Sequence, residues 1–346
     1  MTVNNSIDDH VHQAIQDFAW NRTLHQTLST FIAVVGTILN LIAISVLVKG
    51  GLYRQSPFKF VLNLFVSNLF MCSVCLPIIS SYTFSEHLEN NGVCSFYGYI
   101  IYSILGTAVL NIVLISLNRY FLIVRFTLYR KIYTARNIRI MLAVVWTFYP
   151  ILFLFPLSGI WGSFSYDRFR FICHPVHSSD GFRDFAFTIT LLLTVPSILF
   201  CYIEILKKVN STFRRVRNLQ RAQARRLRNE RQLVRTILVT IILFSCMNLP
   251  FIVLSIADPY MDKASLAAHG FVIYLGWSNA VINPMIYSIL NNQIKSSLLD
   301  IIGKILKRNS RRIFPSEMPK LEIRVISLPL QESSVFVEVR EIKYPN

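Results

Sequence analysis

Seven long stretches without a charged residue dominate the sequence, and polar segments separate them. Each stretch is about as long as a helix needs to be to cross a ~30 Å hydrocarbon core at ~1.5 Å per residue. At these lengths only helices can satisfy their own backbone in lipid. The pattern therefore predicts an all-α protein, a bundle of seven transmembrane helices. The stretches are Thr27–Val48, Phe60–Ser85, Ser95–Asn118, Ile140–Tyr166, Phe185–Ile203, Thr236–Ala257 and Ala264–Gln293.

Polar or amphipathic segments flank the predicted bundle. Apolar residues recur at helical spacing between lysines in 292–307, which predicts a basic amphipathic helix on the membrane surface. We therefore divide the chain into an N-terminal tail (1–26), a seven-helix domain (27–291), this surface helix and a largely disordered C-terminal tail (308–346). The basic loop 207–235 contains few Gly or Pro residues, which favours an extension of the fifth and sixth helices. A solvated charge run is the alternative.

Composition and charge agree with a membrane protein. Hydrophobic residues make up 53% of the chain, charged residues 15%, and the mean hydropathy is +0.47. With the N-terminus outside, all but five of the 35 Lys and Arg residues fall in cytoplasmic segments, which is a positive-inside bias. We expect a multi-pass plasma-membrane protein with a cytoplasmic C-terminus, and the first span in place of a cleavable signal peptide. The net charge of +17 then indicates attraction to anionic inner-leaflet lipid and not to nucleic acid.

Glycosylation and disulfide candidates fit the same orientation. Asn4 and Asn21 begin sequons in the predicted extracellular tail, whereas the sequon at Asn210 falls in the cytoplasmic loop and should remain unmodified. Of six cysteines only Cys94 and Cys173 are expected to face outward, where a disulfide is chemically allowed. We interpret the other four as small apolar residues of helices. No Cys or His spacing suggests a metal site.

Each apolar stretch carries at least one polar, bulky aromatic, Gly or Pro residue at a distinctive place. Buried Asn side chains bond across helices, and Pro residues free backbone carbonyls. Taken in order, and with Cys94 placed 25 residues before Arg119, the set resembles the rhodopsin-like class of G-protein-coupled receptors over about residues 27–307. The residues are Gly36, Asn40, Asn63, Asn68, Arg119, Trp146, Pro196, Phe244, Pro250, Asn283, Pro284, Met285, Ile286 and Tyr287.

Several short motifs narrow the resemblance within that class. They are similar to those of the insect moody and trapped-in-endoderm receptors and, more distantly, of melatonin receptors. The motifs are Asn118-Arg119-Tyr120 with the following Phe-Leu-Ile, Cys75-Leu76-Pro77, Gly159-Ile160-Trp161-Gly162, and the run Ser278 to Pro284.

The resemblance implies a receptor without catalytic residues or cofactors, whose partners are an extracellular ligand and a heterotrimeric G-protein. Arg119 would be held at rest and released towards the G-protein when the sixth helix moves outward. Asn118 replaces the usual acidic neighbour, so we expect Arg119 to pair with Glu230 instead. The residues implied in coupling and activation are Asn118, Arg119, Tyr120, Glu230, Phe244, Pro250, Asn283, Pro284 and Tyr287.

Departures from the family pattern are also informative. Asn68 replaces the family's Asp in the second span, so the usual sodium pocket has lost its charged ligand. Asn248 replaces the family's switch tryptophan two residues before Pro250. In the fifth span Glu204 stands at the expected tyrosine position, which puts that helix's family role in doubt.

The predicted ligand site is recognised partly by what it lacks. Ile101 occupies the place of the Asp that binds amines, and Trp277 that of the opsin lysine. The expected lining is aromatic with neutral polar groups, which suits an apolar or amphipathic small molecule. Arg168 and Arg170 could meet an anionic headgroup or simply cover the loop. The candidates are Tyr99, Tyr102, Leu105, Asn248, Phe251, Ser255, His269, Tyr274, Trp277, Arg168 and Arg170.

Other functional classes fit less well. A transporter or channel would need charged relays or repeat symmetry within the spans. A membrane enzyme would need clustered His, Asp or Glu near the membrane face, and the sequence shows neither pattern. A constitutive or ligand-less receptor remains an alternative, because the switch tryptophan and the sodium ligand are both replaced.

Overall fold

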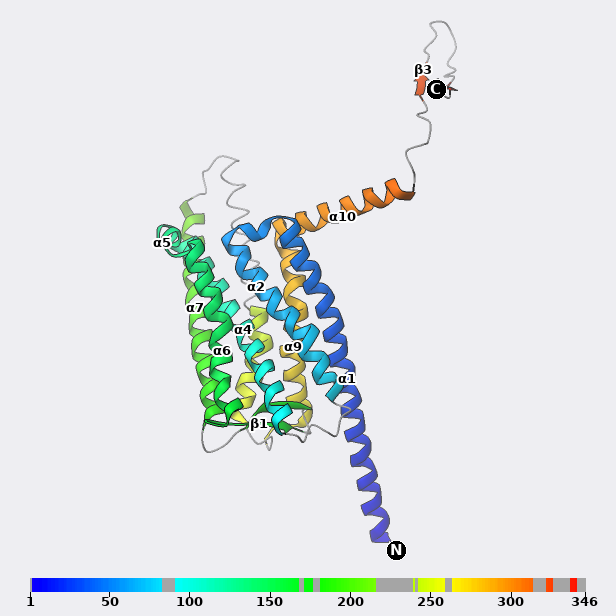
Figure 1. Ribbon diagram of the computed structural model, residues 1–346, viewed down its shortest axis with the longest axis vertical. Coiled ribbons are helices and arrows are strands. Elements are labelled where there is room, and N and C mark those ends of the chain that lie inside the picture. Colours follow the sequence, from blue (N-terminus) through cyan, green and yellow to red (C-terminus); the bar gives the residue numbers. More distant parts are fainter. Residues whose placement is uncertain are drawn as a thin grey trace. The chain divides into compact units, whose positions relative to one another are not determined.

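The computed structural model is predominantly helical (Figure 1) and describes residues 2–82, 91–167, 171–176, 181–215, 239, 242–258, 263–313, 322–325 and 337–340. Within these residues, five helices are long and apolar enough to cross a membrane, judged by length and composition. The shorter helix Ile242–Ala257 and the 25-residue α9 stand at the sixth and seventh predicted spans. The long helices are α1 (Thr2–Lys49), α2 (Ser56–Phe70), α4 (Asn91–Val124), α6 (Ala135–Ser158), α7 (Phe182–Arg215), α9 (Leu266–Leu290) and α10 (Asn292–Ile313).

Short elements join and interrupt these helices. The second span is not one regular helix, because a π-helical stretch separates α2 from α3 just before Pro77. Such bulges locally change the direction of side chains along a helix. The short elements are η1 (Leu52–Arg54), η2 (Met71–Cys75), α3 (Leu76–Tyr82), α5 (Phe126–Ile132), and the strands β1 (Phe164–Asp167), β2 (Ile172–Pro175), β3 (Glu322–Val325) and β4 (Val337–Arg340).

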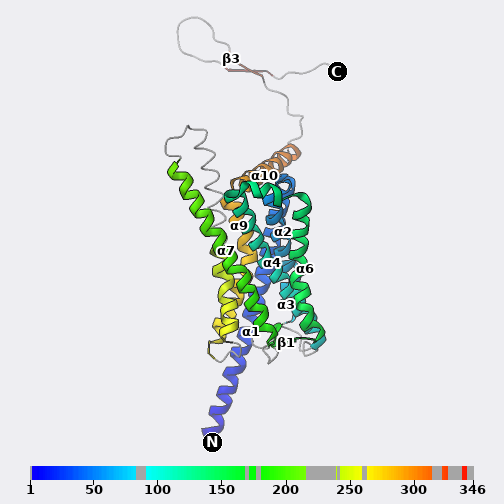
Figure 2. The same cartoon turned by 90° about the vertical axis from the view of Figure 1, so that its left-hand side faces the viewer.

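The helix α4 lies at the centre of the bundle. It packs against α2, α6 and α7, and it also contacts both strands of the β1–β2 hairpin. Cys94 near its start and Arg119 near its end are 25 residues apart, or roughly 38 Å along a helix axis. We call these two ends of the bundle the disulfide end and the arginine end. Figures 1 and 2 both show β1 at one end of the helices, and the hairpin covers the disulfide end.

Element boundaries differ from the sequence prediction at several places. The first helix begins at Thr2, so the predicted polar tail is helical, and the fifth runs on to Arg215. Propensity explains both extensions, since neither segment contains a Pro or Gly that would end a helix there. The amphipathic helix continues to Ile313, and within the C-terminal tail β3 pairs antiparallel with β4. The prediction of a largely disordered tail included no strands.

Buried asparagines tie the central helices together by side-chain hydrogen bonds. Trp146 Nε1 donates to Asn63 Oδ1 at 2.8 Å, and Asn63 Nδ2 donates to Asn111 Oδ1 at 2.5 Å. The chain of bonds joins α6, α2 and α4. Asn40 of α1 likewise donates to the backbone oxygen of Ala280 in α9 at 2.9 Å. Cross-helix bonds of this kind fix the register of helices that pack without a hydrophobic driving force.

Replacing Trp146 with Phe should lower the stability of the bundle. The change removes the donor and leaves Asn63 Oδ1 unsatisfied, which costs about 1–2 kcal/mol. We expect the thermal unfolding midpoint of the purified protein to fall by a few degrees. Thr147→Val is the matched control, because Thr147 is exposed and bonds only its own helix. An equal midpoint for Trp146→Phe and the control would contradict the role of this network.

Candidate functional site

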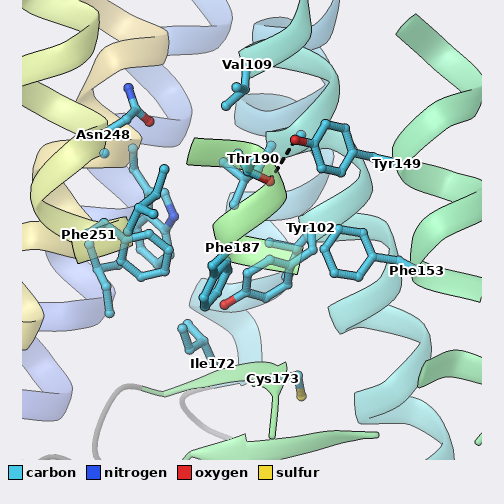
Figure 3. Close-up of a pocket in the computed structure, with 17 residues that line it drawn as sticks. Tyr102, Val109, Tyr149, Phe153, Ile172, Cys173, Phe187, Thr190, Asn248 and Phe251 are labelled. Atoms are coloured by element: carbon cyan, nitrogen blue, oxygen red, sulfur yellow. Dashed lines mark hydrogen bonds between the residues drawn. The ribbon is translucent and has the colours of Figure 1, made fainter. Parts of the chain in front are cut away.

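A cavity of about 90 Å³ lies beneath the hairpin at the disulfide end. This space is several times the ~10–15 Å³ that holds one water on the same measure. Four long helices, the helix Ile242–Ala257 and β2 all contribute side chains, and Figure 3 shows them converging. We call this space the main cavity. Its lining is Ile101, Tyr102, Leu105, Gly106, Val109, Tyr149, Phe153, Ile172, Cys173, Phe187, Thr190, Asn248, Phe251, Ile252, Ile273, Gly276 and Trp277.

The structure brings some of the predicted pocket residues together at this cavity and places others elsewhere. The predicted residues in the lining are Tyr102, Leu105, Asn248, Phe251 and Trp277. Those outside the lining are Tyr99, Ser255, His269 and Tyr274. Arg168 and Arg170 lie outside the described residues.

His269 is buried in a polar contact of its own and does not reach the main cavity. Its Nε2 lies 3.0 Å from Asp258 Oδ2, and Asp258 also accepts the backbone N–H of Ala264 at 2.8 Å. These contacts close the connection between the helix Ile242–Ala257 and α9. The sequence prediction missed the pairing because Asp258 lies eleven positions away and just outside the apolar run.

Tyr274 and Ser255 contact neighbouring helices instead of the cavity. The hydroxyl of Tyr274 lies 2.7 Å from His25 Nδ1, and the His25 ring packs between Phe171 and Trp277. The backbone oxygen of Ser255 accepts from Arg183 Nη2 at 2.9 Å. These contacts hold the helix ends around the cavity, so both residues stabilise the cavity walls without lining the cavity.

The fourth and fifth helices contribute lining residues that the sequence analysis missed. Tyr149 and Phe153 of α6 and Phe187 and Thr190 of α7 face the cavity, and all four are labelled in Figure 3. Their spans are apolar on nearly every side, so the sequence does not distinguish an inward face from a lipid face. The available signal for the inward face is the spacing of each pair. Tyr149 and Phe153 are four residues apart and Phe187 and Thr190 are three apart, so each pair lies on one face of its helix.

The polar groups of the α6–α7 wall satisfy one another. Thr190 Oγ1 donates to the backbone oxygen of Ala186 at 2.7 Å, so it must accept from the Tyr149 hydroxyl, also at 2.7 Å. Gly106 permits this approach, because a Cβ there would overlap the Tyr149 ring. The wall therefore presents mainly aromatic surface to a ligand.

A smaller cavity of about 20 Å³ continues from the main one towards the arginine end. Three asparagines line it: Asn68, Asn248 and Asn279. Phe244 also lines it, one helical turn from Asn248. Asn68 borders this space, which is where the resemblance places the altered sodium pocket.

At the arginine end the predicted coupling residues are buried. Arg119 is only 4% exposed, and Tyr287 of α9 and Tyr129 of α5 lie close enough to influence it electrostatically. No carboxylate within the described part of the chain forms an ion pair with Arg119. Glu230, its predicted partner, lies outside the described residues. Asn118 is also buried, and neither polar atom of its side chain has a hydrogen-bond partner among the described residues.

The remaining predicted activation residues surround this site or connect it to the cavities. Tyr120 packs against Phe200 of α7, with ring centroids 5.3 Å apart. Tyr287 is buried edge-to-face against Phe65, and Asn283 is buried one turn away. Pro284 lies within α9 and Pro250 within the helix Ile242–Ala257.

Cys94 and Cys173 form the disulfide that attaches the hairpin to α4, with Cα atoms 5.4 Å apart. Asn4 and Asn21 lie in α1, in the part whose side chains are not described. Within the described residues, no group of three or more His, Cys, Asp or Glu side chains could hold a metal ion.

Comparison with known proteins identifies the family. The family described as "7 transmembrane receptor (rhodopsin family)" matches residues 39–287. The chain is 26% identical to Protein trapped in endoderm-1 of Drosophila melanogaster, over 81% of this chain and 78% of that protein. It is 22% identical to G-protein coupled receptor moody of Drosophila pseudoobscura pseudoobscura, over 81% of this chain but only about half (52%) of moody's length.

A solved structure supports the fold. Squid rhodopsin matches with a TM-score of 0.68 at 20% identity, over 86% of this chain and 93% of that one. Together with the family match, this confirms the predicted seven-transmembrane helix bundle. The chain belongs to the rhodopsin family of seven-transmembrane receptors.

Proposed function

We propose that this protein is a cell-surface receptor that binds an apolar or amphipathic ligand in the main cavity and activates heterotrimeric G-proteins at the arginine end. One observation carries the proposal: a single bundle holds an aromatic cavity at one end and a buried arginine at the other. Aromatic pockets with few polar groups suit small apolar ligands. A buried arginine in an apolar span marks a functional site.

The proposed orientation puts the disulfide end outside the cell and the arginine end in the cytoplasm. The positive-inside distribution of Lys and Arg supports this arrangement, as does an outward-facing disulfide. The ligand would therefore enter from outside, and the cytoplasmic end would face the G-protein and the anionic inner leaflet.

The helix Ile242–Ala257 offers a physical connection between the two ends. Phe251 and Asn248 line the main cavity, and Phe244 lines the small cavity one turn further on. Pro250 lies between these contacts and lacks the N–H of a regular helix, so it provides a bending point. We infer that the ligand shifts an existing equilibrium towards a state in which this helix moves outward.

Replacing Glu230 with Ala should raise ligand-independent signalling. Because Arg119 is buried, the resting state would lose more than the ~1 kcal/mol of an exposed pair if Glu230 is its partner, so basal activity should rise by about fivefold or more. A G-protein dissociation sensor at matched surface expression measures the change. Lys207→Ala, which removes an exposed charge bonded to Glu204, serves as a control. Unchanged basal activity in Glu230→Ala would reject the pairing.

The proposed function is tested by a panel of G-protein dissociation sensors covering all G-protein families. The receptor and Arg119→Ala are compared at equal surface expression, at rest and with libraries of lipids, peptides and indoles. We expect one or more G-proteins to respond to the receptor, and Arg119→Ala to abolish the response. No difference from untransfected cells with any G-protein would reject coupling, and a full response by Arg119→Ala would reject the role of the arginine.

A further inference from the structure

We propose that the ligand of the main cavity is uncharged and donates a hydrogen bond to Asn248 Oδ1 at the cavity floor. This inference rests on the proposed function, because it assumes that the main cavity is where the ligand binds. It names the class of ligand: a molecule with an apolar, aromatic-sized body and one terminal neutral donor, such as a hydroxyl or an amide N–H.

The described lining carries no charge, which disfavours a charged group on the ligand. No Asp, Glu, Lys, Arg or His side chain lines the main cavity or the small cavity among the described residues. An ammonium or carboxylate that enters an apolar enclosure without a partner loses its hydration and gains little in return. A neutral molecule pays a much smaller desolvation cost there.

The hydrogen bond of Asn248 fixes which of its atoms is available to a ligand. Its Nδ2 donates to the backbone oxygen of Phe244 at 2.9 Å. A carbonyl oxygen can only accept, so the nitrogen must occupy this position and the amide cannot be flipped. Oδ1 is left to accept. Oδ1 points towards α9 and would lie 3.9 Å from a Cβ atom placed at Gly276. Figure 3 shows this oxygen on the side of the amide that faces the cavity.

The other polar groups of the α6–α7 wall are already committed. The Tyr149 hydroxyl donates its proton to Thr190, and the Thr190 hydroxyl donates its proton to the backbone oxygen of Ala186. Neither hydroxyl can therefore donate to a ligand, and the amide oxygen Asn248 Oδ1 is a stronger acceptor than the hydroxyl oxygens of the lining. The glycine at position 276 keeps a side chain from covering that oxygen.

The small cavity explains why the ligand's polar group should stop at Asn248. The two cavities share Leu105, Val109, Asn248, Gly276 and Trp277, so Asn248 stands where they meet. About 20 Å³ is room for a single water and for little else. Asn68 lines this space, is 3% exposed, and has no hydrogen-bond partner for its Nδ2 among the described residues. One water there would satisfy Asn68 and block deeper entry.

The test uses four probes that share a naphthalene body: naphthylethanol, its methyl ether, naphthylethylamine and naphthylacetate. The full-length receptor is reconstituted in phospholipid nanodiscs, and dissociation constants are measured by equilibrium dialysis. Empty nanodiscs correct for partition into lipid. The ether lacks the donor of the alcohol and carries one additional methyl group, so the change in their ratio of affinities on Asn248→Leu isolates the hydrogen bond.

The alcohol should bind roughly 3- to 10-fold more tightly than the ether, and both charged probes should bind more weakly than the alcohol. Asn248→Leu should bring the alcohol-to-ether ratio close to one. Cys246→Leu puts the same side chain at an exposed position on the same helix and should preserve the ratio. The comparison of probes on the unmodified receptor needs no variant, so it holds even if Asn248→Leu fails to fold.

Three results would overturn the inference: equal affinity for alcohol and ether, tighter binding of a charged probe, or a ratio that survives Asn248→Leu. In these cases binding of an apolar ligand in the cavity would still stand. If no probe binds, both the inference and the cavity's proposed role fail. If the alcohol preference is found but no G-protein responds to the receptor, only the proposed signalling fails.

Discussion

Replacing Cys173 with Ser is expected to weaken the binding of naphthylethanol and to destabilise the receptor. The disulfide links residues 79 positions apart and attaches β2 to α4. Bridges that close long loops typically contribute about 2–4 kcal/mol, which corresponds to a fall of roughly 5–10 °C in the unfolding midpoint. Ile172 and Cys173 line the main cavity, so a detached hairpin opens it to water. We expect a loss of affinity of at least about tenfold.

The matched control for this prediction is Cys246→Ser. Cys246 is a free, exposed cysteine on the helix Ile242–Ala257 and lines neither cavity. Cys246→Ser should leave the unfolding midpoint and the affinity for naphthylethanol equal to those of the unmodified receptor within experimental error. Cys173→Ser with unaltered affinity would show that the hairpin does not close the binding site, whatever its effect on stability.

Replacing Asn118 with Asp should strongly suppress basal activity. Asn118 is buried, and within the described part of the chain neither of its polar atoms has a hydrogen-bond partner, so the amide does not hold the neighbouring arginine. A carboxylate at this place would pair with the guanidinium, and breaking a buried pair is costly. The resting state would then dominate, and we expect basal nucleotide exchange to fall by about fivefold or more.

Asn118→Leu separates charge from size. Leu has the same number of side-chain heavy atoms and the same branching as Asn, but it cannot pair with Arg119, and it removes the unsatisfied polar atoms. Basal exchange in Asn118→Leu should stay close to that of the unmodified receptor. If Leu suppresses exchange as much as Asp, packing and not pairing controls the arginine, and the electrostatic account is wrong.

The positions of the helices could be predicted from sequence because charge in hydrocarbon is so costly that charge-free runs reveal the spans. The ends of the helices could not be predicted in this way, because α1 and α7 continue through polar segments that also allow a helix. The π-helical stretch before Pro77 was also missed. Its bonding pattern depends on packing against neighbouring helices and has no signal in the order of residues alone.

The candidate site was predictable only where the sequence contrasts with its surroundings. Arg119 and Asn248 stand out because polar groups are rare in their spans. Tyr149 and Phe187 do not stand out, because each is one aromatic residue among many in α6 and α7. Which of these residues faces the cavity depends on tertiary packing. His269 was assigned to the pocket for its polarity, but it is buried against Asp258. Polarity in a span therefore indicates a buried contact, and the structure is needed to identify the partner.

The most direct test of the account is nucleotide exchange by purified components. The receptor and Arg119→Ala are reconstituted in nanodiscs with each class of purified heterotrimer, and the uptake of a non-hydrolysable GTP analogue is followed. We predict that the receptor accelerates exchange on at least one heterotrimer, and that Arg119→Ala returns the rate to that of empty nanodiscs while it still binds naphthylethanol. Exchange at the empty-nanodisc rate with every heterotrimer, with naphthylethanol present and absent, would contradict the account.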